Sequence, residues 1–198
     1  MTTMKLSADA QNLLFRTART ANAFEPGPLP ADTLENIYDL VRWAPSSGNT
    51  QPLRYLSVES GEARARLVPH LAEGNRDKTA SAPLVVVLAA DMEFYEHMNE
   101  LLPYMDNARD YFAADKEKAA ENARFNAILQ AGYFILGIRA LGFAAGPMLG
   151  FDAAGVDQEF FPDGRFKSIL VVNIGHPAEN AWMERLPRMD AEQVITSI

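Results

Sequence analysis

Residues 42–55 read "RWAPSSGNTQPLRY", and this stretch holds more short polar side chains than a turn requires. Pro45 and Pro52 bracket a run of hydroxyl, glycine and amide residues, and apolar sequence resumes on both sides. An ordinary surface turn is made with one or two such residues. The surplus of hydrogen-bonding groups therefore indicates a loop with a role beyond changing the direction of the chain.

The sequence around this loop predicts a helix before it and a strand after it. The segment "DTLENIYDLVRWA" has apolar residues at helical spacing, with Asp32 and Glu35 placed as a capping box. The segment "LRYLSV" alternates like a half-buried strand. Nearer the N-terminus, residues 6–21 predict a first helix with one buried stripe, and "NAFEPGPLP" predicts an extended crossing because proline cannot continue a helix.

Further along, two apolar segments predict strands and one long segment predicts a buried helix. "PLVVVLAAD" is a continuous apolar run typical of a central strand covered on both faces, and "FKSILVVNIG" predicts another strand. Between them lies the helical pattern "AAENARFNAILQAGYFILGIRALG". Its small residues indicate either a crowded core or a subunit interface: Ala127, Ala131, Gly132 and Gly137. We expect a mixed α/β or α+β sheet protein with one domain over residues 1–198.

Composition excludes several classes of function. The net charge of -8 argues against nucleic acid, since binding to phosphates needs clustered Lys and Arg. The longest apolar segment is too short to cross a bilayer and the N-terminus lacks a signal-peptide pattern, so we expect a cytoplasmic protein without membrane contact. The absence of cysteine and the scattered positions of three histidines give no metal-ligand pattern: His70, His97 and His176.

No motif for protein-borne catalysis is present. The sequence lacks G-x-S-x-G, and neither the dinucleotide-binding glycine pattern nor the phosphate-binding loop of nucleotide hydrolases occurs. A globular chain with many amide and hydroxyl groups but no nucleophile or metal set is most simply explained by a bound organic cofactor.

Four motifs together resemble one family. "APSSGNTQP" is similar to the Pro-Ser-Ser-x-Asn-x-Gln-Pro signature of the FMN-dependent nitroreductase family, and it likewise follows a helix and precedes a strand. "NRDK", residues 75–78, resembles that family's Asn-x-x-Lys flavin contact. "GPMLGFD" resembles its Pro-x-x-Gly-Phe-Asp turn, and "RLP" at Arg185 resembles its C-terminal phosphate-binding arginine. The resemblance implies a nitroreductase-like fold, with a mostly antiparallel central sheet flanked by helices, and an intertwined homodimer with FMN at the subunit interface.

The resemblance also assigns cofactor-binding residues. They are Arg19, Thr20, Ser46, Ser47, Asn49, Gln51, Asn75, Lys78, Asn126, Pro147, Leu149, Gly150 and Arg185. Lys78 would offset negative charge on the pyrimidine edge of the reduced flavin, and the turn "GPMLG" would bring the N–H groups of Leu149 and Gly150 to N5. Arg19 and Arg185 would clamp the phosphate. The polar loop would contact the flavin of the partner subunit.

Two positions depart from the family pattern. Relatives commonly carry two basic residues in the first motif, at the positions of Ala18 and Asn22. Asn126 stands where many relatives have a longer, flavin-contacting glutamine. Phosphate binding and the Asn126 contact therefore differ from the family pattern in this chain.

The activity implied by the resemblance is that of an FMN-dependent NAD(P)H oxidoreductase, which passes hydride through flavin N5 in alternate turns. "RTANAF", "DMEFYE" and "RLPR" are most similar to the malonic-semialdehyde reductase branch, associated with pyrimidine degradation, which would make 3-hydroxypropionate. Arg54, Arg109 and Arg124 are candidates for the substrate carboxylate, and Arg109 is preferred because its aromatic-rich surroundings could form a lid.

The residues leave alternative functions open. A broad nitro- or quinone reductase fits the same motifs, as does a flavin-binding protein without turnover. A plain α/β domain whose polar loop is only structural is a further alternative. The choice between NADH and NADPH is also open, because no dinucleotide fingerprint exists to read.

Overall fold

The computed structural model describes residues 4–198. Its centre is a four-stranded antiparallel sheet in the order β1-β2-β4-β3, as the resemblance implied. The strands are β1 (Leu53–Ser57), β2 (Leu84–Asp91), β3 (Ala144–Met148) and β4 (Phe166–Gly175). The two longest strands, β2 and β4, occupy the middle, and β1 and β3 form the edges.

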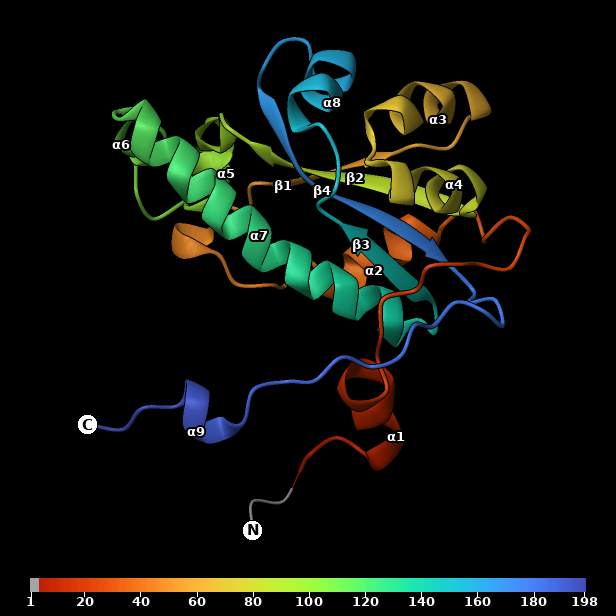
Figure 1. Ribbon diagram of the computed structural model, residues 1–198. Helices are drawn as coiled ribbons and strands as arrows, with labels where there is room; N and C mark the ends of the chain where they lie inside the picture. The colour runs from red at the N-terminus through yellow and green to blue at the C-terminus, as the bar shows by residue number, and fades with distance from the viewer. Residues whose placement is uncertain (1–3) are drawn as a thin grey trace.

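Helices cover both faces of the sheet (Figure 1). One face carries α2 (Thr33–Val41) and the long α7 (Lys116–Ala140), with α5 (Met98–Leu101) and α6 (Ala108–Ala113) near one end of α7. The other carries α3 (Gly61–Leu67), α4 (Glu73–Ser81) and α8 (Ala153–Phe160). Two short α-helices, α1 (Ala8–Gln11) and α9 (Ala191–Val194), lie near the termini. Further helical turns are η1 (Asn12–Arg16), η2 (Ser47–Asn49), η3 (Val68–His70) and η4 (Phe94–His97).

Strand β2 is buried on both faces, as its continuous apolar sequence predicts. Val86, Leu88 and Ala90 join the core on the α7 side, and the alternate residues of β2 join the core on the other side. Successive side chains of β2 are therefore buried on opposite faces of the sheet. This explains why apolar and polar residues do not alternate along the strand.

The small residues of α7 serve a crowded core. Ala127, Ala131 and Gly137 are buried, and a Cβ added at Gly137 would lie 2.3 Å from Cγ1 of Val41 in α2. Helix α2 can therefore approach α7 closely only because Gly137 has no side chain. Gly132 is exposed. It lies on an outer face of α7 that carries large exposed apolar residues: Phe125, Ile128, Leu129 and Tyr133.

The N-terminal helix differs from its prediction. The predicted helix over residues 6–21 is instead the single turn of α1 followed by η1, which ends at Arg16. The predicted stripe is not buried, since Leu6 and Leu13 are exposed while Gln11 is buried. The segment lies off the sheet in Figure 1, and the remaining stripe residues, Ala10, Leu14 and Ala18, are only partly buried.

The capping box predicted for α2 is also wrong. The side chain of Asp32 makes no capping hydrogen bond. Thr33 instead turns back to the preceding segment, where its N–H and its hydroxyl both donate to the carbonyl of Pro30, at 3.0 and 2.6 Å. The proline-rich approach to the helix therefore accepts the first backbone N–H of α2, and the N–H that the Asp32 carboxylate was expected to cap receives no side-chain cap.

The segment predicted as a turn, "GPMLG", is partly a strand. Gly146, Pro147 and Met148 belong to β3, and the turn begins at Leu149. Proline is tolerated because β3 lies at the edge of the sheet, where one row of backbone groups has no neighbouring strand. Gly146 is also required there, because a Cβ would lie 2.7 Å from the carbonyl oxygen of Ala21.

The chain ends in an arm, residues 186–198, that leaves the body of the molecule and includes α9 (Figure 1). All hydrogen bonds found for these residues within the described chain stay inside the arm. The arm exposes a series of apolar side chains: Leu186, Met189, Val194, Ile195 and Ile198. Over residues 4–198, no helix is both long enough and apolar enough to span a membrane.

Candidate functional site

The predicted site residues fall into two groups in a single chain. The first, here called the α4–β3 cluster, contains Arg19, Thr20, Asn75, Lys78, Pro147, Leu149, Gly150 and Arg185. The second, here called the polar loop, contains Ser46, Ser47, Asn49 and Gln51, and is held by Asn126. Within residues 4–198, no hydrogen bond joins the two groups.

Helix α4 positions Asn75 and Lys78 beside the turn that follows β3. The side-chain amide of Asn75 donates to the carbonyl of Gly150 at 2.9 Å, and the N–H of Ala72 donates to the same oxygen at 2.9 Å. A Cβ at Gly150 would lie 2.7 Å from the Asn75 amide nitrogen. Glycine is therefore needed for this turn to lie against α4.

Lys78 reaches from α4 to the segment after η1. Its Nζ donates to Oδ1 of Asn22 at 3.2 Å, and no carboxylate lies within 4.0 Å of it among residues 4–198. Burial lowers the pKa of Lys78, because the ammonium group loses contact with water. A cation without a counter-charge, partly removed from water, is suited to an anionic or electron-rich ligand.

The turn after β3 presents free backbone donors. The N–H groups of Leu149 and Gly150 have no hydrogen-bond acceptor in the described chain, and the Leu149 side chain is 76% exposed. The polar groups that this turn offers to a ligand are therefore backbone N–H groups and not a side chain. The side chain at position 149 is not needed for that role.

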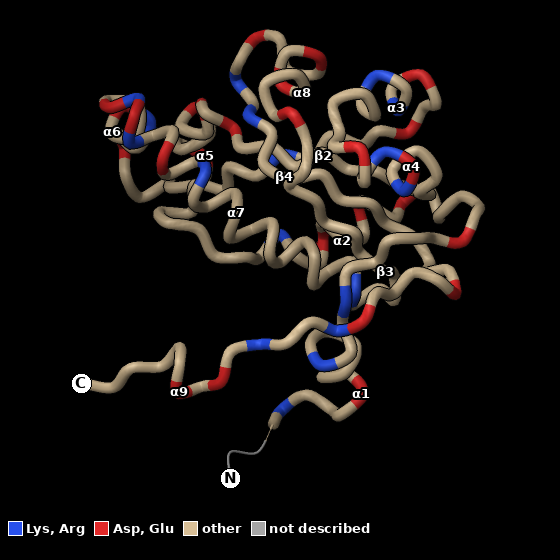
Figure 2. Tube along the Cα trace, viewed as in Figure 1, with Lys and Arg blue, Asp and Glu red and all other residues tan. Residues whose placement is uncertain are grey.

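Basic residues from both ends of the chain meet nearby. Arg19 donates to the carbonyl of Met183 at 3.1 Å, and Arg185 donates to the carbonyls of Arg16 and Ala18 at 2.8 and 3.1 Å. Figure 2 shows the basic positions gathered where these two segments cross. A cavity of about 200 Å³ lies between them. It is lined by Ala18, Arg19, Thr20, Asn22, Met183, Glu184, Arg185, Leu186 and Arg188. Its guanidinium groups suit a phosphate.

Beneath α4, a buried polar contact fixes the helix to the sheet. Asn173 of β4 donates to the hydroxyl of Thr79 at 3.0 Å, and both residues are fully buried. The Oδ1 of Asn173 has no partner in the described chain. The sequence does not predict this contact, because Asn173 and Thr79 lie on different elements and match no motif. The available signal is that Asn173 is a polar residue inside an otherwise apolar strand.

The polar loop has a backbone that its sequence alone does not favour. Gly48, Asn49 and Gln51 adopt left-handed conformations with φ of 60, 55 and 40°. For the two residues that have a Cβ, this costs on the order of 1–2 kcal/mol each. The conformation is held from outside the loop, since Asn126 Oδ1 accepts from the N–H of Ser47 at 2.8 Å and Asn49 donates to the carbonyl of Leu101 at 2.8 Å.

Within the loop, the side chains form a connected set. Gln51 donates from its side chain to Oδ1 of Asn49 at 2.9 Å, and the hydroxyl of Ser46 accepts from the N–H of Gln51 at 3.2 Å. Asn126 is 2% exposed and also donates to the carbonyl of Asn122 at 2.9 Å, so its amide supports the loop in this chain. Direct contact of Asn126 with a cofactor stays a prediction.

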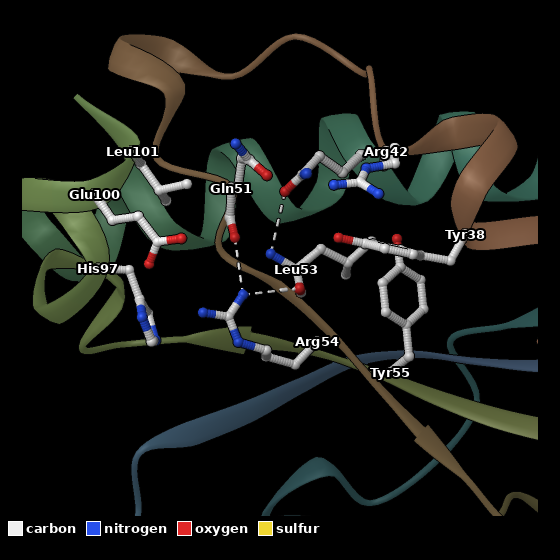
Figure 3. Close-up of a pocket in the computed structure, with 10 residues that line it drawn as sticks. Tyr38, Arg42, Gln51, Leu53, Arg54, Tyr55, His97, Glu100 and Leu101 are labelled. Atoms are coloured by element: carbon white, nitrogen blue, oxygen red, sulfur yellow. Dashed lines mark hydrogen bonds between the residues drawn. The ribbon is translucent and has the colours of Figure 1, made fainter. Parts of the chain in front are cut away.

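A second cavity, of about 370 Å³, lies beside the polar loop between α2, β1 and α5 (Figure 3). It is lined by Tyr38, Arg42, Gln51, Leu53, Arg54, Tyr55, His97, Glu100, Leu101 and Gln130. The buried Gln130 accepts the N–H of Leu53 at 3.1 Å, which joins α7 to the first residue of β1.

The three arginines proposed for a substrate carboxylate differ in their surroundings. Arg54 is bound by Asp91 at 2.8 Å. Arg109 is bound by Glu96 at 2.7 Å and by Asp110 at 3.1 Å, and these hydrogen bonds raise the pKa of Arg109. Arg124 lies on the exposed side of α7 with no carboxylate within 4.0 Å among residues 4–198. The preferred residue, Arg109, thus already has two counter-charges in one chain.

Comparisons with known proteins give the family and the fold of the chain. The profile of the nitroreductase family matches residues 16–176. A Streptomyces griseus protein assigned as an NADH dehydrogenase/NAD(P)H nitroreductase is 50% identical over 193 residues, which is 98% of each chain. A Bacillus subtilis crystal structure assigned as a nitroreductase superposes with a TM-score of 0.85 at 22% identity, covering 96% of this chain and 99% of that one.

A second solved structure, from Exiguobacterium sibiricum, is assigned as a nitroreductase in complex with FMN. It superposes with a TM-score of 0.84 at 18% identity and covers 99% of this chain and 100% of that chain. At such low identity these two structures show the shared fold.

Proposed function

The chain belongs to the nitroreductase family, and from this premise we propose that it is an FMN-dependent NAD(P)H oxidoreductase. The observation that carries the proposal is the α4–β3 cluster. Within residues 4–198 it combines a lysine with no carboxylate partner, backbone N–H groups with no acceptor and a basic cavity, all on neighbouring segments. FMN, when bound, supplies hydride chemistry by accepting hydride from NADH or NADPH and passing it to an acceptor in alternate turns.

The residues of the cluster fit the parts of FMN. Arg19 and Arg185 line a cavity whose charge suits the phosphate, and the nearby hydroxyl of Thr20 adds a further donor. Lys78 suits the pyrimidine edge, because a fixed cation stabilises negative charge there. The N–H groups of Leu149 and Gly150 are donors for a ring nitrogen, and Pro147 precedes them on the edge strand. Asn75 holds this turn in place.

We further propose that the site is shared by two copies of the chain. The polar loop carries Ser46, Ser47, Asn49 and Gln51 but does not join the α4–β3 cluster in one chain. Exposed apolar residues on the outer face of α7 and along the C-terminal arm give a second copy an extensive surface to cover. A homodimer would bring the polar loop of one chain to the cluster of the other.

For the acceptor, we propose malonic semialdehyde, which would be reduced to 3-hydroxypropionate as part of pyrimidine degradation. The support is the motif resemblance together with an exposed arginine, Arg124, that has no carboxylate within 4.0 Å in the described part of the chain. A broad nitro- or quinone reductase fits the family membership equally well, because an open flavin face accepts many small molecules. Since NAD(P)H is the reductant, a cytoplasmic location is part of the proposal.

The test is a visible spectrum of the purified protein under anaerobic conditions. We expect a yellow protein whose flavin absorbance is bleached by NADH or NADPH and returns when the semialdehyde is added. A colourless protein that binds no added FMN would contradict the cofactor. A yellow protein that NAD(P)H does not bleach would be a flavin-binding protein without turnover. Comparing kcat/KM for semialdehydes, nitroaromatics and quinones separates the two substrate classes.

A further inference from the structure

A buried carboxylate lies at the end of β2, next to the polar loop. Asp91 is fully buried and accepts hydrogen bonds on both oxygens: from Arg165 at 2.9 Å on each, from Arg54 at 2.8 Å and from the N–H of Glu93 at 2.9 Å. Burial by itself raises the pKa of the Asp91 carboxyl, but these donors and the two positive charges outweigh burial and lower the pKa overall. Asp91 is therefore a fixed anion.

Arg54 connects this anion to the polar loop. One terminal nitrogen of its guanidinium binds Asp91, and the other donates to the carbonyl of Gln51 at 2.8 Å and to that of Leu53 at 3.0 Å (Figure 3). The planar fork of an arginine allows two partners to be held at a set separation. The carboxylate thus sets the position of Arg54, which in turn sets the position of the Gln51 carbonyl.

Pro52, the residue after Gln51, is bound directly by Asp91. The backbone N–H of Asp91 donates to the carbonyl of Pro52 at 2.9 Å. Gln51 has a left-handed backbone conformation, which is unfavourable for a residue with a Cβ. The direction of its carbonyl must therefore be held by contacts with other residues. The adjacent carbonyls of Gln51 and Pro52 are therefore both restrained through Asp91, the first by way of Arg54 and the second directly.

We propose that Asp91 and Arg54 are positioning residues for the flavin-contacting loop: Asp91 orients Arg54, and Arg54 fixes Gln51 in the conformation that binds cofactor. The inference rests on the proposed function, since it concerns the same FMN site. Arg54 then has a structural partner on each side and is not the residue that receives the substrate carboxylate.

The chain provides a matched control. Arg54 and Arg165 are each 30% exposed and both bind Asp91, but only Arg54 contacts the loop. We would measure FMN affinity of apo-protein by fluorescence quenching, the flavin absorption spectrum, and the melting temperature for Arg54→Met and Arg165→Met. Loss of one charge-assisted hydrogen bond to the loop should weaken FMN binding about tenfold in Arg54→Met and shift its spectrum toward that of free FMN.

Arg165→Met should keep FMN affinity within about twofold of the unmodified protein. It removes more hydrogen bonds to Asp91 than Arg54→Met does, and it should lower the melting temperature at least as much as Arg54→Met. Equal loss of FMN affinity in the two variants, or no loss in either, would overturn the inference. Absence of FMN binding by the unmodified protein would instead overturn the proposed function.

A third variant covers failure of Arg54→Met to fold. Arg54→Lys keeps a positive charge beside Asp91 but replaces the fork by a single ammonium group. We expect a melting temperature near that of the unmodified protein with FMN affinity reduced severalfold. Full FMN affinity in Arg54→Lys would show that charge alone suffices and would overturn positioning through the fork.

Discussion

The Nζ of Lys78 lies 3.2 Å from Oδ1 of Asn22, a neutral partner that cannot offset a positive charge, and burial lowers the pKa of Lys78. Because burial lowers its pKa, the ammonium form is disfavoured by folding. The apo-protein should therefore gain stability as the pH rises from this lowered pKa toward the ordinary value of 10.5.

Replacing Lys78 by methionine should separate cofactor binding from stability. We expect Lys78→Met to raise the Kd for FMN by about tenfold or more, while apo-protein at pH 7 melts no lower than before. Calorimetric titration and thermal melts provide the two measurements. The exposed Lys116→Met is the control and should change neither; a melting temperature that falls in Lys78→Met would contradict the assignment.

Gly150→Ala should displace Asn75. The new Cβ would meet the Asn75 amide nitrogen at 2.7 Å, so the hydrogen bond to the Gly150 carbonyl must break, at a cost of about 1 kcal/mol, and the turn must shift. FMN affinity should fall with stability. Gly74 lies in α4 beside Asn75 and has open space around it, so Gly74→Ala should instead be neutral or stabilising by about 0.5–1 kcal/mol. Urea unfolding would compare them.

Asp91→Asn should show a distinctive dependence on pH. The folded pKa of Asp91 is lowered, so its stabilising effect is present above the unfolded value of 3.8 and is lost as the pH falls through the folded pKa. We expect a loss of about 3–5 kcal/mol at pH 7, which shrinks below pH 4. Chemical unfolding at pH 7 and pH 3.5 tests this. The exposed Asp110→Asn should change little at either pH.

Two arginine variants test recognition of a substrate carboxylate. If Arg124 receives it, Arg124→Ala should raise KM for malonic semialdehyde about tenfold and leave KM for an uncharged quinone unchanged. If Arg109 leaves its carboxylate partners in the homodimer, Arg109→Ala should show that pattern instead. Steady-state kinetics with both acceptors decides, and equal effects on the two acceptors would remove either residue from this role.

Assembly should be sensitive to the apolar surface of α7 and to the arm. Ile128, 61% exposed in one chain, is a candidate for burial between copies, so Ile128→Asp should dissociate a homodimer and abolish FMN binding. A chain ending at Arg188 should be weakened in the same way. Analytical ultracentrifugation measures the mass of each variant and so distinguishes monomer from homodimer. A stable FMN-bound monomer, in either variant or in the unmodified protein, would contradict the shared site.

The sequence predicts the two central strands and the helix that covers them, because β2, β4 and α7 carry long apolar patterns. It predicts β3 poorly, since Gly146 and Pro147 are typical of turns and are allowed there only by the edge position. The N-terminal stripe fails for another reason: the segment forms only α1 and η1, and Leu6 and Leu13 stay exposed in the chain.

For the site, motif order predicts residues that the structure places on α4, on the turn after β3 and in the polar loop. What it missed are contacts between distant segments. Asp91 and Arg165 are 74 residues apart and match no local pattern, so only the pairing of β2 with β4 brings them together. The burial of Asn173 against Thr79 likewise depends on tertiary packing.

The left-handed polar loop also bears on the order in which the protein folds. Its supports come from Asn126 on α7, Leu101 at the end of α5 and Arg54 on β1, which belong to elements that must first be assembled. A peptide of the loop sequence alone would lack these contacts, and the left-handed conformations of Asn49 and Gln51 would be unfavourable in it. The shape of the loop therefore arises late in folding, after the sheet and its long helix have docked. If the loop binds cofactor as proposed, a destabilised variant should lose that binding before it loses its secondary structure.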